Sequence, residues 1–97
     1  MRDVFSSAAS RDVKRALDYY MREAGSKVAN DFIAQLDAKV ETILKNPELY
    51  RVVAKNLRCA NLDRFPYQIV YRIANNSVIR ITSVRHHKQH PDFGLGR

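Results

Sequence analysis

The spacing of apolar residues changes from a helical period to a strand period near the middle of this 97-residue chain. Apolar side chains first recur every three or four positions, as on one face of a helix, and later alternate with polar ones, as along a strand. Helices followed by strands predict an α+β fold. The length predicts a single domain, residues 1–97, with a modest core.

Two helices are predicted in the first half of the chain. Ser6 is expected to cap the first, at 7–23, because its hydroxyl can accept a backbone N–H of the first turn. Gly25 and Ser26 interrupt the pattern. The second helix is predicted at 27–45 and ends before Pro47, since proline disfavours helix in the residue before it. So short a connection predicts an antiparallel helical hairpin.

Three strands are predicted in the second half, after a short strand that precedes Ser6. They cover 57–62, the alternating run from Tyr67 and the run 78–84, with a turn at Asn75-Asn76, where asparagine tolerates positive φ. The register across this turn is open by one residue, so the sequence does not say which arginines share a face. The order β-α-α-β-β-β predicts the helical hairpin packed on one face of a small antiparallel β-sheet.

The net charge of +7 comes entirely from the second half of the chain. Residues 1–50 carry eight Lys or Arg and eight Asp or Glu, whereas residues 51–97 carry nine basic residues and two acidic ones. All three histidines also lie in the second half. Such a surface suits nucleic acid, an enzyme that handles nucleic acid, or an acidic protein partner, while a solvated face without a partner remains the alternative.

The sequence predicts a cytoplasmic protein. No apolar run is long enough to span a membrane, and no secretory signal pattern is visible. Cys59 is the only cysteine, so an internal disulfide is excluded, and a packed thiol is the expected state. No cofactor is expected.

Several segments in a fixed order resemble the RelE/ParE toxin superfamily of bacterial type II toxin-antitoxin systems. They are VFSSAASRDV (4–13), NPELYR (46–51), RFPYQIVYRI (64–73) and VIRITSV (78–84). Ser7 stands where the family commonly has proline. The resemblance covers nearly the whole chain and implies a RelE/ParE-like fold and a toxin held inactive by an antitoxin. RelE-like members cut mRNA in the ribosomal A site, and ParE-like members poison DNA gyrase.

The resemblance to RelE-like ribonucleases is incomplete at the residues that would do the chemistry. Metal-independent RNA cleavage needs a base, an acid and cations around the phosphate. Gln68 stands where the family has a catalytic arginine, and Phe93 stands where it has a tyrosine. The ribonuclease hypothesis leaves four candidates: Arg58, Arg64, His86 and His87.

The strand FPYQIVYR (65–72) and the histidine-rich ending are more similar to the ParE, or plasmid stabilisation, branch. That branch implies a gyrase poison that does no chemistry of its own. The segment SVRHHKQHPDF (83–93) is therefore predicted to form a basic, partner-binding edge. The predicted partner-binding residues are Arg64, Arg85, His86, His87, Lys88 and His90.

Zinc binding by the histidine cluster is a weaker alternative. His86 and His90 have the spacing of two ligands on a helix, but no helix signal surrounds them and Pro91 follows directly. No metal site is predicted.

The family resemblance also implies an antitoxin partner, with an acidic and partly disordered tail that folds over the toxin. Such a tail lays a helix beside the helical hairpin and often a strand on the sheet edge. Phe32 and Leu36 could line that groove but are expected in the core. A third hypothesis is a non-toxic homologue that only binds its antitoxin, motivated by the missing ribonuclease residues and by the short first strand.

Overall fold

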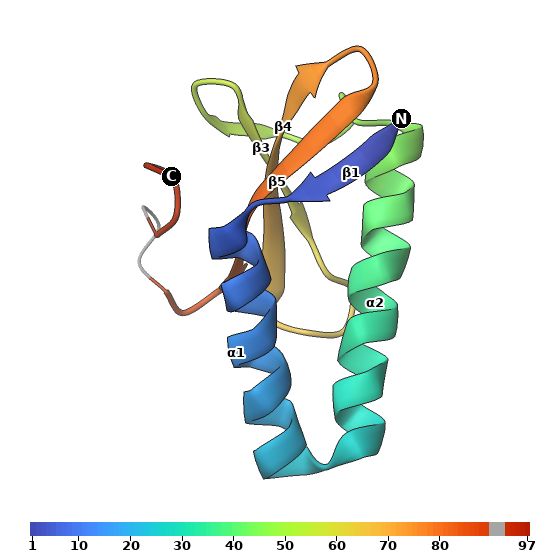
Figure 1. Ribbon diagram of the computed structural model, residues 1–97, viewed down its shortest axis with the longest axis vertical. Helices are drawn as coiled ribbons and strands as arrows, with labels where there is room; N and C mark the ends of the chain where they lie inside the picture. Colours follow the sequence, from blue (N-terminus) through green and yellow to red (C-terminus); the bar gives the residue numbers. More distant parts are fainter. Residues whose placement is uncertain (90–92) are drawn as a thin grey trace.

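A computed structural model places two helices against one face of a five-stranded mixed sheet (Figure 1). The structure describes residues 1–89 and 93–97. The elements are β1 (Arg2–Phe5), α1 (Ser7–Ala24), α2 (Ser26–Lys45), β2 (Val52–Ala54), β3 (Leu57–Asn61), β4 (Tyr67–Asn75) and β5 (Val78–His86). The predicted α+β class and the order of helices and strands are confirmed.

The helix ends follow the local sequence signals. Ser6 caps α1 as predicted, because its Oγ accepts the N–H of Ala9 at 3.0 Å. Gly25 ends α1 at φ 91°, a conformation that favours glycine, and its N–H donates to the carbonyl of Tyr20. Helix α2 ends at Lys45, two residues before Pro47. Neither helix, in the part of the chain described, is long and apolar enough to cross a membrane.

The sheet has the strand order β1-β5-β4-β3-β2. The sequence predicted an antiparallel sheet, whereas the observed sheet is mixed. Strands β2 to β5 pair antiparallel, but β1 runs parallel to β5. Parallel neighbours need a long connection, and here the helical hairpin and three strands separate β1 from β5 in the chain. The three-residue strand β2 was not predicted because it is too short for a period to be read.

The β4–β5 hairpin turns at Asn76-Ser77, one residue later than predicted. The side chain of Asn75 accepts the N–H of Ser77 at 2.9 Å, which stabilises the turn at this position. The register that the sequence left open places Arg72 opposite Arg80 and Gln68 opposite Arg85. Each pair therefore shares a face of the sheet.

The core lies between the helical hairpin and the sheet. Phe32 of α2 is fully buried, and its ring lies 5.2–5.4 Å from the rings of Tyr20, Phe65 and Tyr67. Tyr71 is also fully buried, and its hydroxyl donates to the carbonyl of Pro47. Phe32 and Leu36 are thus core residues, as expected, and do not line an outer groove. This packing holds β4 and β5 rigidly against the helices.

Candidate functional site

The residues of the predicted basic edge lie on both faces of the sheet at the end of β5. His86 lies on the helix side, with its ring 5.0 Å from that of Tyr67 in edge-to-face contact. His87 and Lys88 follow the strand and are exposed. Arg64 is exposed in the loop before β4, and the N–H of His87 donates to the carbonyl of Pro66 in that loop at 2.8 Å. The structure therefore brings Arg64, His86, His87 and Lys88 to one corner, while His90 lies outside the described residues.

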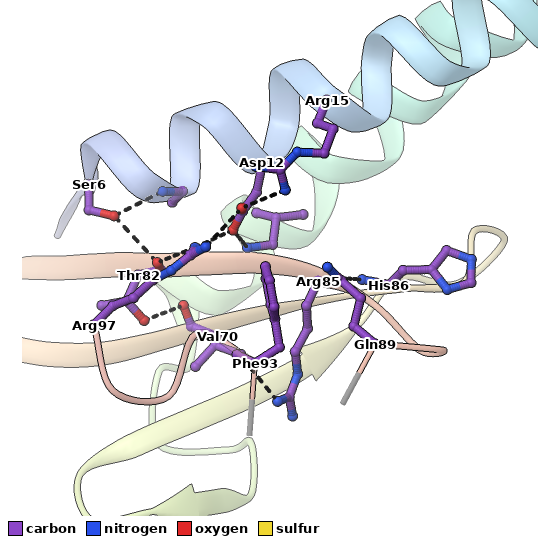
Figure 2. Close-up of polar contacts among 12 residues, drawn as sticks. Ser6, Asp12, Arg15, Val70, Thr82, Arg85, His86, Gln89, Phe93 and Arg97 are labelled. Carbon is purple, nitrogen blue, oxygen red and sulfur yellow. Dashed lines mark hydrogen bonds and ion pairs between the residues drawn. The ribbon is translucent and has the colours of Figure 1, made fainter. Parts of the chain in front are cut away.

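Arg85 is not part of this exposed corner. Only 8% of the residue is accessible, and its Nε donates to Oε1 of Gln68 at 2.8 Å. Gln68 in turn donates to Asn61 of β3. Nη1 of Arg85 donates to the carbonyl of Phe93 at 3.4 Å (Figure 2). Because the side chain follows the sheet face away from the helices, it anchors the C-terminal segment instead of presenting a free charge.

A cavity of about 500 Å³ opens between α1 and the end of β5. Arg15 and Tyr19 line it from α1, and His86 and Lys88 line it from the strand end. Nδ1 of His86 accepts the backbone N–H of Lys88 at 2.9 Å, so the neutral ring carries its proton on Nε2. Burial, followed by the charges of Lys88 and His87, lowers the pKa of His86. Among residues 1–89 and 93–97, no three His, Cys, Asp or Glu side chains gather into a metal site.

Asp12 of α1 is a buried carboxylate that the sequence reading missed. Its Oδ2 accepts the N–H of Val84 at 3.0 Å and Nη1 of Arg97 at 2.5 Å, and its Oδ1 accepts Nη2 of Arg97 at 3.2 Å (Figure 2). Arg15 lies 3.5 Å from the same carboxylate. The sequence contained one indication that Asp12 is buried. Asp12 lies three positions after Ala9 and four before Ala16, so all three residues share the buried face of α1.

Residues 93–97, here called the C-terminal segment, lie against the sheet face away from the helices. Gly94 has φ 78°, and a Cβ there would come within 2.8 Å of Ser83, so the close approach requires glycine. The guanidinium of Arg97 lies 4.8 Å from the ring centre of Phe93 and also donates to the carbonyl of Thr82. The segment is therefore fixed at Ser83, Arg85 and Asp12.

Comparison of this chain with known proteins identifies its family. The family model for "ParE toxin of type II toxin-antitoxin system, parDE" matches residues 4–91. The chain belongs to the ParE toxin family. No curated protein matches this ParE family member. A solved structure described as the chromosomal ParDE TA system from P. aeruginosa is similar, with a TM-score of 0.76 and 19% sequence identity. The match covers 89% of this chain and 95% of that chain.

The likeness to that structure concerns the fold, and it confirms the predicted RelE/ParE-like architecture of this ParE family member. Of the four ribonuclease candidates, Arg64, His86 and His87 lie at the corner, and Arg58 lies apart from them. Nη1 of Arg58 donates to the carbonyls of Glu48 and Tyr50, which fixes the loop after α2, and Arg58 is opposite Tyr71 in the sheet. His86, the last residue of β5, is opposite Tyr67, the first residue of β4, and lies at the corner.

The pKa of His86 in this ParE family member provides a test of the corner's geometry. We expect His86 to titrate below its ordinary value of 6.5, because burial and the nearby positive charges disfavour the protonated ring. Because the pKa of His86 is lower in the folded state than in the unfolded state, protonation of the ring disfavours folding. The stability associated with the neutral ring is therefore full above pH 6.5 and is lost as pH falls through the pKa of the folded state. Lys88→Gln should raise the pKa toward 6.5. An NMR titration of the ring C–H signals measures both, and a wild-type midpoint at or above 6.5 would contradict the geometry.

Proposed function

We propose that this ParE family member is the toxin of a type II toxin-antitoxin system, that it poisons DNA gyrase in the cytoplasm, and that a cognate antitoxin with an acidic tail neutralises it. The proposed action is binding without catalysis. The observation that carries this choice is the hydrogen-bonded chain of Asn61, Gln68 and Arg85, in which the neutral Gln68 stands where RelE-like ribonucleases have an arginine.

In that chain Gln68 cannot supply the positive charge that the arginine of a RelE-like ribonuclease supplies at this position. Gln68 donates to Asn61 and accepts from Arg85, so its amide is used on both sides. Arg85 also donates to the carbonyl of Phe93, a residue without the hydroxyl that a tyrosine would supply. These contacts hold the C-terminal segment in place. They support a binding role for this end of the sheet over acid and base catalysis.

The charge distribution supports the proposed partners. Arg64, His87 and Lys88 are exposed at one corner, and Arg15 and Lys88 border the cavity beside α1. Positive charge around a groove favours an acidic segment such as the tail of an antitoxin, and it also speeds association with such a segment. The same exposed corner is accessible to the complex of gyrase with DNA.

A supercoiling assay with gyrase, ATP and antitoxin-free protein tests the gyrase proposal. We expect the wild type to block supercoiling or to trap cleaved DNA, and Arg64→Ala/Lys88→Ala to lose most of this effect because two exposed charges leave the corner. Arg11→Ala/Lys27→Ala removes the same charge from exposed helix positions and should retain the effect. Gyrase that is unaffected by the wild type would contradict the proposal.

A second candidate function, ribosome-dependent mRNA cleavage, is favoured by one observation. His86, whose pKa is lowered by burial and by Lys88 and His87, lines a cavity that Arg15 and Lys88 also border, which joins a candidate base to two cations. Cleavage of ribosome-bound mRNA by the wild type, abolished in His86→Gln, would establish this function. A protein that affects neither gyrase nor mRNA but binds its antitoxin would be a non-toxic homologue.

A further inference from the structure

Two arginines face each other on neighbouring strands, far from the corner just described. Arg72 of β4 and Arg80 of β5 are directly opposed in the sheet, near the hairpin turn. Among the residues that the structure describes, neither guanidinium has a hydrogen bond or an ion pair. Like charges directly opposite each other destabilise a strand pair. The pair is therefore an uncompensated concentration of positive charge.

A hollow of about 350 Å³ lies next to this pair. Arg72 lines it together with Lys55 and Asn56, which come from the turn between β2 and β3, and Leu95 and Gly96 of the C-terminal segment form another wall. Lys55 is exposed and has φ 46°. Among residues 1–89 and 93–97, no carboxylate and no aromatic side chain lines the hollow. The hollow is thus a positively charged surface with partly apolar walls, on the sheet face away from the helices. Arg97 also lines it, but its guanidinium is paired with Asp12.

We propose that Arg72, Arg80 and Lys55 bind the phosphate backbone of duplex DNA. A guanidinium binds phosphate oxygens through two parallel N–H donors, and lysine binds them as a point charge. The side-chain amide of Asn56 supplies a further donor of the kind that contacts phosphates. The two arginines extend from paired strands of a packed sheet, so the backbone holds them side by side before binding.

No aromatic side chain of the described residues lines the hollow, which favours a duplex over a single strand. Proteins that bind single-stranded nucleic acid without sequence preference stack the bases on aromatic side chains. Here Tyr67 and Tyr71, on the same strand as Arg72, pack toward the helices. A surface that offers cations alone recognises the backbone and leaves the bases paired. Binding is therefore expected to depend little on DNA sequence.

This DNA contact does not depend on the gyrase proposal, and it is tested without gyrase. We measure the affinity of antitoxin-free protein for a short labelled DNA duplex by fluorescence anisotropy over a series of KCl concentrations. Arg72→Gln/Arg80→Gln should weaken binding for all duplex sequences and reduce the slope of log K against log [KCl] by about 1.8, since each lost phosphate contact accounts for about 0.9.

Two further variants separate specific phosphate contacts from net charge and from misfolding. Arg11→Gln/Lys27→Gln removes two exposed charges from the helices and should retain the wild-type slope. Arg72→Lys/Arg80→Lys keeps both charges and should also retain it. No binding by the wild type, an unchanged slope in Arg72→Gln/Arg80→Gln, or equal losses in the helix control would overturn the proposal. Tighter binding to single-stranded RNA than to the duplex would overturn the choice of ligand.

Discussion

Replacing Asp12 with alanine is expected to lower the free energy of unfolding by about 2–4 kcal/mol. The carboxylate is buried and holds the N–H of Val84 and the guanidinium of Arg97. Without it, the N–H of Val84 loses its partner in a buried position, while Arg97, with 27% of its side chain exposed, reaches water in part. Urea unfolding followed by circular dichroism measures the change.

Asp18→Ala is the matched control for Asp12→Ala. Asp18 is also a carboxylate on α1, but its ion pair with Lys14 is exposed, with 57% of the Asp18 side chain accessible. The expected loss is below about 0.5 kcal/mol, the usual contribution of an exposed pair one helical turn apart. Equal losses in the two variants would show that the contacts of Asp12 with β5 and Arg97 contribute little to stability.

Replacing Phe32 with alanine is expected to cost about 3–5 kcal/mol of unfolding free energy. The ring is fully buried and contacts Tyr20, Phe65 and Tyr67, so its removal leaves a cavity between α2 and the sheet. Because Phe65 precedes β4 and Tyr67 contacts His86, the corner of the proposed binding surface should also lose order. Unfolding curves and the NMR signals of His86 test the two effects.

Tyr19→Ala provides the control for the loss of an aromatic ring. Tyr19 is half exposed and contacts only Tyr20 among the described aromatic rings. Its truncation should cost about 1 kcal/mol or less. If Phe32→Ala were no more destabilising than Tyr19→Ala, the aromatic cluster would not be the centre of the core.

The helices and the three long strands could be predicted because each carries its own local signal. Ser6, Gly25 and Pro47 mark the helix ends, and Tyr67, Ile69, Tyr71 and Ile73 alternate along β4. The parallel pairing of β1 with β5 has no such signal, since it joins residues more than 70 positions apart. The β4–β5 register also shifts at two places, between Val70 and Tyr71 and between Ile73 and Asn75, and the hydrogen bond from Ser77 to Asn75 stabilises the turn.

The candidate site was predicted only in part. The sequence identified the exposed corner with Arg64, His87 and Lys88, but it could not show that Arg85 turns to the other face and anchors the C-terminal segment. Simple alternation along β5 would place Arg85 on the same face as Ile81, but the register shifts between Val70 and Tyr71 and leaves Thr82 without a paired residue in β4. Ser83 and Arg85 therefore lie on the opposite face. The contact between Asp12 and Arg97 spans 85 positions and became visible only when the segment was placed on the sheet.

Strand β1 covers the edge of β5 only as far as Ile81, and the backbone beyond it is covered by side chains. The carbonyl of Thr82 accepts from Ser6 and Arg97, the N–H of Val84 from β5 donates to Asp12, and the N–H of His86 donates to Gln89. An uncovered strand edge is a template for uncontrolled pairing with other chains. These contacts therefore protect the free protein from aggregating through this edge, and any strand that pairs there must first displace them.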